Sequence, residues 1–416
     1  MKKLILYILL VTMVFGAHAQ ELDQYLQEAY ENNPGLKASY HEFEAAMKRV
    51  AQVSALPDPT LSFGYFISPI ETRVGAQRAK LSLSQMFPWF GTISARKDLA
   101  AMQAEARYQQ FLDDKAQLTL KVKQAYFPIL ELQEQIRIQE QNLGLLESYK
   151  RVATTSYANG RSSMTDVLRV DLRLDDLKTE IQLMRDQMKP LSMAFAYLLH
   201  HPDSVSLSFE DSLSIEDQWL VNQANDSNFW YHPKMEGLSQ NLSTWQAKEQ
   251  LSNKNAMPQI GLGLDYAFVA KREGISLPDN GKDAIMPMVT LSIPIYQKKY
   301  RGEKEESRLM QTAVQNRMED LQSQLQSQYE TAWYEAKASW DRYQLFEQQE
   351  ETTHSIIDLL YTEYAHSGQN FEELLRMQQQ LLKYELAKVT AAKSYQLALA
   401  KLNYLTFNAE ENESGK

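Results

Sequence analysis

The sequence predicts a mainly α-helical protein with a transmembrane β component, built as a duplicated repeat of helix, β-hairpin and long α-helical hairpin. Three observations predict this fold class. Residues 124–198 recur 207 positions later, long stretches lack Gly and Pro, and four short runs alternate between apolar and small or polar residues. The recurrence needs no gap, as expected of uninterrupted helices, in which one insertion would rotate every later side chain off its face.

The matched positions carry identical or similar side chains. The identical pairs include Ala125 and Ala332, Tyr157 and Tyr364, Leu174 and Leu381, and Tyr197 and Tyr404. The elements predicted in one half of the chain are therefore expected at the matched positions of the other half.

Composition excludes several classes of protein. The chain of 416 residues has no Cys, which rules out a disulfide framework and a thiolate metal site. Lys and Arg number 43 and Asp and Glu 53, a formal net charge of −10. Nucleic-acid binding, which depends on basic surface, is therefore not expected.

Residues 1–19 have the pattern of a secretory signal peptide. Lys2 and Lys3 precede an apolar core, and Ala17-His18-Ala19 forms a small-x-small cleavage site. Removing both lysines, with no acid, would give the mature chain a charge of −12. No Cys follows the site, so no lipoprotein anchor is expected, and no later apolar run reaches the roughly twenty residues of a membrane helix. A membrane location would require a β-barrel.

The first repeat, residues 20–200, begins with a helix from Glu21 to Ala55, interrupted at Asn33-Pro34. Strands follow at about 60–68 and 78–87, with a loop from Pro69 to Gln77 between them. The hairpin has one apolar and one small or polar face. In a soluble protein the apolar face would cover a core, whereas in an outer membrane it would meet lipid while the other face lined a watery lumen.

The helical hairpin of the first repeat starts at Thr92 and runs to about Ser156, or on the order of 100 Å of continuous helix. Pro128 is expected to kink it. The segment Tyr157 to Gly160 ends this helix, and Ser162 or Ser163 can cap the next, which returns antiparallel to about Leu199 with a bend at Pro190.

A linker, residues 201–230, joins the repeats, and residues 231–407 form the second one. Its strands are predicted at about 259–270 and 284–293, and its helical hairpin at about 303–364 and 371–403. Asp265 on the small-residue face would suit a wet lumen. The tail, 408–416, is polar and expected to be disordered.

Four strands of nine to eleven residues are long enough to cross a membrane but too few to close. Because open strand edges are not tolerated in lipid, the smallest water-filled barrel made of whole chains is a trimer with 12 strands. The helices, with their narrow apolar seams, would then continue this barrel as a long α-helical tunnel.

Two motifs add a family resemblance. Phe87-Pro88-Trp89-Phe90-Gly91 follows the second strand, and Tyr157-Ala-Asn-Gly with Asp166-Val-Leu lies at the tip of the helical hairpin. With the order of elements, they resemble the TolC family of outer-membrane efflux proteins. This resemblance implies a homotrimeric channel-tunnel in the cell outer membrane that extends into the periplasm. It would give passive exit to drugs, toxic compounds or metal ions delivered by an inner-membrane transporter through a periplasmic adaptor protein. The Pro-Trp-Phe-Gly form favours a pump of the resistance-nodulation-division class.

In that family the turns at the periplasmic tip contact the adaptor and close the pore. The resemblance assigns docking and gating to Tyr157, Gly160, Arg161, Asp166, Tyr364, Gly368, Gln369, Glu372 and Glu373. Alternatively, both Tyr residues are packing residues and both Gly residues are helix stops. Gly368 lies one place later than Gly160, and Gln369 stands where many members have a basic latch, a role that Arg161 could take. A ring of Asp166, Glu372 and Glu373 would attract cations.

No enzyme, cofactor or metal site is predicted, because the sequence has no phosphate loop, metal-ligand cluster or nucleophile elbow. Met286 and Met288, with His200-His201, are a poor copper or silver site, since such sites bring more convergent ligands. A periplasmic coiled-coil scaffold or adaptor would explain the helices but not four strands at matched positions. An envelope enzyme would need converging polar groups in a pocket.

Overall fold

The computed structural model describes residues 20–200, 207, 209, 213, 215, 229–274, 276–367 and 369–407. The predicted signal peptide, the predicted tail, Gly368 and most of the predicted linker lie outside the described residues. Within the described part, the chain divides into two compact units, which are described separately. Unit 1 comprises the described residues within Met1–Ala38, Leu112–His232 and Gln322–Lys416, and unit 2 those within Ser39–Phe111 and Pro233–Leu321.

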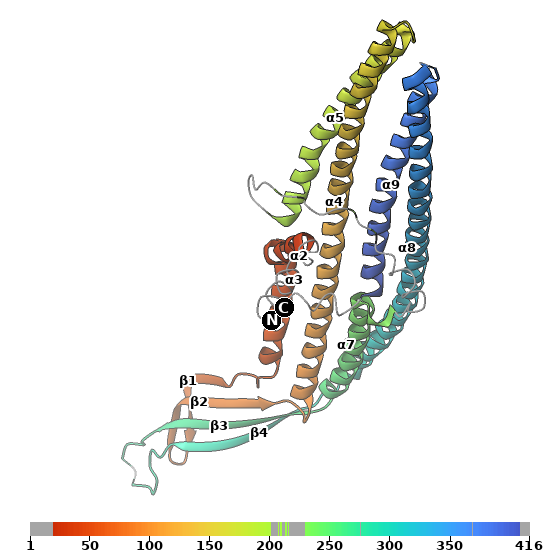
Figure 1. Cartoon of the computed structure of the whole chain (residues 1–416). Coiled ribbons are helices and arrows are strands. Elements are labelled where there is room, and N and C mark those ends of the chain that lie inside the picture. The colour runs from red at the N-terminus through yellow and green to blue at the C-terminus, as the bar shows by residue number, and fades with distance from the viewer. Residues whose placement is uncertain are drawn as a thin grey trace, which may run out of the picture. The chain divides into compact units, whose positions relative to one another are not determined.

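Unit 2 contains one sheet of four antiparallel strands in the order β1-β2-β3-β4. The strands are β1 (Thr60–Thr72), β2 (Gly75–Phe87), β3 (Gln259–Ala270) and β4 (Ala284–Ser292). The two strands of each repeat form a hairpin, and β2 of the first repeat pairs along β3 of the second (Figure 1). Each repeat therefore contributes two strands to the same sheet.

The predicted loop between the first two strands, Pro69 to Gln77, is wrong. β1 continues to Thr72 and β2 starts at Gly75, so only two residues form the turn. Gly75 has a φ of 135°, a conformation that side chains rarely adopt, and the Thr72 hydroxyl donates to its carbonyl at 2.6 Å. The pairing shifts register between Tyr65 and Ile70, which accommodates Pro69, a residue with no N–H to donate.

The register places all the predicted apolar side chains on one face of the sheet, because directly paired residues share a face. Leu61 pairs with Leu83, and Leu83 pairs with Leu264. Side chains on this apolar face are mostly half exposed or more within the single chain: Leu61, Phe63, Tyr65, Leu83, Leu262, Ile285, Val289 and Leu291. The opposite face, called here the inner face, carries the row Ser62, Ser82, Asp265 and Met286.

The helices repeat as the sequence predicted. The first repeat has α2 (Gln20–Asn32), α3 (Pro34–Val53), α4 (Thr92–Ala158) and α5 (Met164–Leu199). The short η1 (Phe229–Tyr231) precedes the second, which has α7 (Pro233–Asn255), α8 (Gln297–Ser367) and α9 (Phe371–Thr406). Both α5 and α9 have 36 residues, and α9 begins and ends 207 positions after α5. Pro128 and Pro190 lie inside α4 and α5 without ending them.

Among the described helices, none has both the length and the apolar content that crossing a membrane requires.

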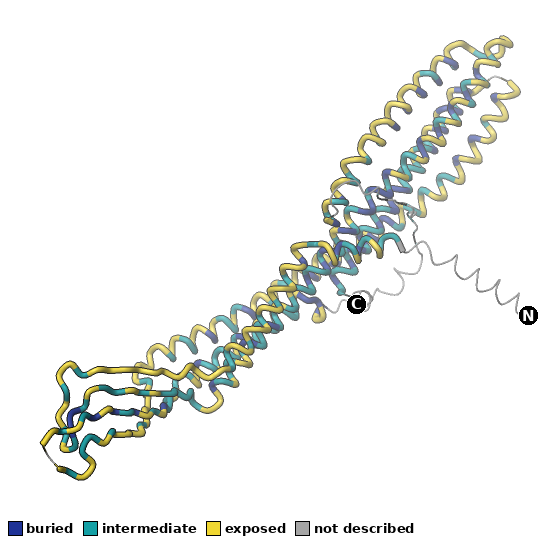
Figure 2. The backbone as a smooth tube through the Cα atoms, turned by 90° about the vertical axis from the view of Figure 1, so that its left-hand side faces the viewer, coloured by how far each residue is buried: buried dark blue, intermediate teal, exposed yellow. Residues whose placement is uncertain are grey.

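The core of unit 1 consists of narrow apolar seams between helices. On α5, Leu174 and Leu177 are buried, whereas Leu168 and Leu172 are more than half exposed. Figure 2 shows the same alternation of buried and exposed positions along the helices. The seams of the two repeats meet in one cluster: Leu146, Tyr149, Ala153, Val167, Val170, Leu174, Leu177, Ile181, Ile357, Tyr364, Phe371, Leu374, Leu375 and Leu381. The two helical hairpins therefore share a core.

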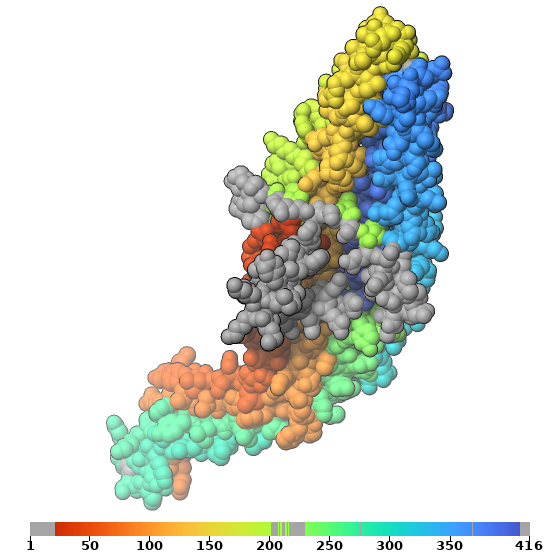
Figure 3. Space-filling model, viewed as in Figure 1, coloured from red at the N-terminus to blue at the C-terminus, as the bar shows by residue number. Residues whose placement is uncertain are grey.

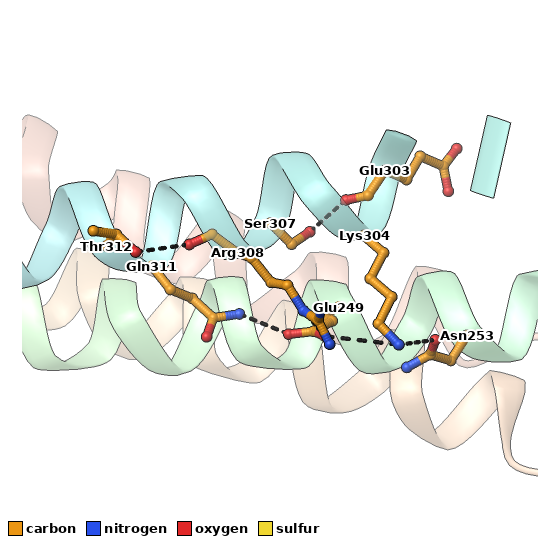
Figure 4. A network of polar contacts seen from close by, with 8 residues as sticks. All are labelled: Glu249, Asn253, Glu303, Lys304, Ser307, Arg308, Gln311 and Thr312. Atoms are coloured by element: carbon orange, nitrogen blue, oxygen red, sulfur yellow. Dashed lines mark hydrogen bonds and ion pairs between the residues drawn. The ribbon is translucent and has the colours of Figure 1, made fainter. Parts of the chain in front are cut away.

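In unit 2, α7 is fixed to the first turns of α8 by a polar network around Glu249 (Figure 4). Its carboxylate accepts hydrogen bonds from Gln311 Nε2 at 3.0 Å and from Arg308 Nε at 2.9 Å. Lys304 lies 4.0 Å away and also contacts Asn253. The Gln311 hydrogen bond and the two cations lower the pKa of Glu249 below its ordinary value of 4.5.

We expect Glu249→Gln to reduce the thermal stability of the chain. The amide keeps the size of the carboxyl but loses the charge that Arg308 and Lys304 face, at a cost of about 1 kcal/mol. For a chain of 416 residues this corresponds to a midpoint lower by about 1 °C. Circular dichroism melts check it, with the exposed Glu273→Gln as control.

The effect should also depend on pH. Because the folded-state pKa of Glu249 is depressed, its stabilising contribution is present above pH 4.5 and is lost as the pH falls through the folded-state pKa. The difference between wild type and variant should therefore shrink below pH 4.5. An equal difference at pH 7 and in strong acid would contradict this.

Candidate functional site: the two helix turns

The first helix turn, between α4 and α5, is formed by a glycine stop and a serine cap. Gly160 has a φ of 68°, and no atom lies within 4 Å of the position that a Cβ would occupy, so backbone conformation alone demands glycine. Ser163 is the N-cap of α5, and its hydroxyl accepts from the Thr165 backbone N–H at 3.1 Å. The structure thus selects Ser163 from the two predicted caps.

The second turn, between α8 and α9, is made differently. Asn370 precedes α9 with a φ of 66°, a left-handed conformation that Asn tolerates. Its side-chain amide donates to Glu363 at 2.8 Å, which fixes the turn to the end of α8. Gln369 is exposed, and Gly368 lies outside the described residues. The two turns therefore occupy matched positions without sharing a geometry.

The two equivalent tyrosines have different environments. Tyr364 is 1% exposed and packs against Phe371 with ring centroids 4.4 Å apart. Tyr157 is 48% exposed. Of the two predicted roles, packing therefore describes Tyr364 in the single chain, whereas Tyr157 presents its ring at the surface.

The side chain of Tyr364 also joins the second turn to the first. Burial raises the pKa of Tyr364, and the nearby hydroxyls of Ser162 and Ser156 oppose that rise. Both serines belong to the first turn and the end of α4. In Figure 3 the tip of the first hairpin, in yellow, lies beside the tip of the second, in blue. The structure therefore brings the two predicted turns together.

Arginines neutralise two of the three predicted acidic residues. Arg169 on α5 pairs with Glu372 on α9 at 2.9 Å, and Arg376 pairs with Glu373 at 2.5 Å. Asp166 is half-buried at the start of α5. Arg161 is exposed and takes part in no ion pair within the described residues, so its role as a latch stays a prediction. Two of the three acidic side chains therefore have a cationic partner beside them in the single chain.

The inner face of the sheet holds a charged pair that the sequence did not predict. Asp265 is 2% exposed and forms an ion pair with Lys80 on the neighbouring strand β2. Alternation along β2 does place Lys80 opposite the apolar residues, but only the β2–β3 register brings it to Asp265. Asp265 therefore lies on the polar face, as predicted, with a partner from the other repeat.

A second unpredicted cluster lies on the helices. Glu350, His354 and Glu385 each offer a ligand atom, and these atoms lie within 4.8 Å of one another. No metal-ligand cluster was expected from the sequence. The spacing of Glu350 and His354, one helical turn apart, was a visible signal, but the third residue comes from α9 and needed the fold.

Comparison with known structures shows the same fold in outer-membrane channels. The outer-membrane channel OprN has a TM-score of 0.73 at 16% identity, covering 93% of this chain and 89% of that one. VceC from Vibrio cholerae has a TM-score of 0.72 at 14% identity, covering 92% and 95%. The open-state MtrE channel of Neisseria gonorrhoeae has a TM-score of 0.70 at 16% identity, covering 93% and 88%. The sequence has no match among curated proteins.

The chain thus shares the fold of these outer-membrane channels, with a β-sheet and a pair of long helical hairpins. Residues 25–194, which lie within α2 to α5, match the family model described as outer membrane efflux protein. The resemblance inferred from Phe87 to Gly91 and from the tip motif is confirmed by this match. The second repeat shares the fold through the structural similarity.

We expect Tyr364→Ala and Tyr157→Ala to have unequal effects. Truncating the buried Tyr364 should cost about 3–5 kcal/mol of local stability, because it opens a cavity between both hairpins. Truncating Tyr157 should cost less than about 1 kcal/mol. Hydrogen exchange of the turn amides checks this, with faster exchange in both turns only for Tyr364→Ala. Equal effects would contradict the difference in burial.

Proposed function

We propose that this chain is one subunit of a homotrimeric channel-tunnel in the outer membrane, giving passive exit to substrates exported from the cell. The observation that carries the proposal is the four-stranded sheet with one apolar face and one polar inner face. An apolar face that is exposed in the single chain suits lipid, and the Lys80–Asp265 pair suits a water-filled lumen.

The sheet order supports assembly of several chains. In the described sheet, β1 and β4 are the outermost strands, and each has a partner on one side only. Unpaired backbone groups are costly in lipid, so β1 of one copy would pair with β4 of the next. Three copies would close a barrel of twelve strands, and their helical hairpins would line the continuing tunnel in the periplasm.

The partners follow from the family. A periplasmic adaptor protein and an inner-membrane transporter, of the resistance-nodulation-division class by the Pro88-Trp89-Phe90-Gly91 motif, would deliver the substrate. Adaptor docking and gating are assigned to the two turns. Tyr157, Arg161 and Gln369 are exposed there and would contact the adaptor, whereas Tyr364 would hold the turns together. Transport would need no catalytic step in this chain.

Electron microscopy of the detergent-extracted protein tests the assembly. The expected particle has three-fold symmetry, twelve strands at one end and a helical tube of about 100 Å. Monomers, or rods without a barrel, would overturn the proposal and favour a periplasmic scaffold or adaptor.

Ion selectivity tests the role of the turns. A closed or narrow tip should conduct cations in preference to anions, because each acidic residue occurs three times around the aperture. Asp166→Asn and Glu373→Gln should each reduce this preference, because each removes one negative charge per subunit; in Glu373→Gln the charge of Arg376 is left without its partner. Reversal potentials in planar bilayers measure it. The gating role would be contradicted by a pore that has no cation preference and whose reversal potential does not change when Asp166→Asn and Glu373→Gln are combined.

A further inference from the structure

Three potential metal ligands converge between α8 and α9 in unit 1. Glu350 and His354 lie one turn apart on α8, and Glu385 faces them from α9. One carboxylate oxygen from each Glu and one ring nitrogen from His354 lie within 4.8 Å of one another. This group lies apart from the helix turns, and none of its members takes part in docking or gating there.

We propose that Glu350, His354 and Glu385 bind a divalent first-row transition-metal ion such as Zn²⁺, which would join α8 to α9. This inference goes beyond the channel function and does not rest on it. The ion would act as a cross-link in the wall of the second helical hairpin.

The donor set defines the class of ion. Two carboxylate oxygens and one imidazole nitrogen suit Zn²⁺ and its neighbours, whereas Cu(I) prefers sulfur and Mg²⁺ or Ca²⁺ prefer oxygen alone. Tetrahedral zinc, with bonds of about 2.0–2.2 Å, holds its ligands roughly 3.3 Å apart. The three side chains must therefore close by about 1–1.5 Å, which rotamer changes of long Glu side chains can supply. The exposed His354 gives the ion access from solvent and leaves a position for water.

The charges around the cluster favour a cation there. Glu350 and Glu385 are both half-buried, and burial together with the Glu350 charge raises the pKa of Glu385. Two carboxylates so close together repel each other unless a positive charge lies nearby. Lys388 supplies one by forming an ion pair with Glu350. A doubly charged ion would interact with both carboxylates at once.

The remaining charged neighbour is on α4. Arg137 attracts Glu385 but donates two hydrogen bonds to Glu134, one from Nε at 2.8 Å, which orient the guanidinium toward its own helix. The charged neighbours of the cluster are therefore Lys388 and Arg137. Lys388 is the direct competitor for the ion, since its ammonium already contacts a proposed ligand.

Zinc titration of the full-length protein tests the site. The chain, freed of any affinity tag and of metal by EDTA dialysis, is titrated with Zn²⁺ by calorimetry in detergent at pH 7.5. We expect one ion per chain, no heat with Mg²⁺, and at least tenfold weaker binding in His354→Ala and in Glu385→Gln. His366→Ala, an exposed histidine near the end of the same helix, is the matched control and should bind as the wild type does.

A second variant keeps the test decisive if a ligand variant misfolds. Lys388→Met removes the competing ammonium, so its zinc affinity should rise several-fold and zinc should raise its melting midpoint more than it raises that of the wild type. Absence of stoichiometric binding, or binding that neither His354→Ala nor Glu385→Gln weakens, would overturn the proposal.

Discussion

The pairing of β2 with β3 is the constraint on which the rest of the structure depends. It is the only strand pairing that joins the two repeats within the described sheet, and it sets which side chains face outward. A slip of one residue would turn Asp265 to the apolar face and separate it from Lys80. The Lys80–Asp265 pair therefore reinforces the register that the apolar side chains favour. Burying one of these charges without the other would be costly.

The duplication makes the two repeats similar, but equivalent residues do not all have the same environment in the packed cluster. α5 and α9 have equal lengths and matched boundaries, yet Tyr157 is exposed where Tyr364 is buried. Other equivalent pairs, such as Leu174 and Leu381, are both buried in the shared cluster, so the two tyrosines are a local departure from the symmetry of the repeats. One copy serves packing, and the other is free to diverge toward a surface role. The described parts of the two turns differ as well, with a positive φ at Gly160 in the first and at Asn370 in the second.

Sequence periodicity predicted the fold class, because the repeats of two and of three to four residues reflect which face of an element is apolar. Because the sequence contains an internal repeat, the elements predicted in one half could be compared with those predicted in the other half. Local chemistry was less well predicted. The two-residue turn at Arg73 and Val74 was missed because Pro69 and polar residues resemble a longer loop, whereas the register shift near Tyr65 absorbs the proline.

Apart from the Glu373–Arg376 pair on α9, the side-chain contacts that escaped prediction join residues far apart in sequence. Arg169 with Glu372, and Glu350 with Glu385, depend on which helix lies beside which and at what height. Neither spacing nor composition carries that information. Of the candidate site, the location of the turns and the glycine stop at Gly160 were predictable, but the neutralisation of the acidic residues by arginine was not.

The equal length of α5 and α9 limits which insertions the helical region can accept. An insertion of seven residues turns a helix to within about 20° of its starting orientation, so it lengthens a helix while keeping its apolar seam in place. Such an insertion preserves the shared core only if all four arms of the two hairpins receive it at the same height. Natural length variants of this architecture should therefore differ by whole heptads, entered symmetrically in both repeats. The helical region would then change in length in steps of about 10 Å.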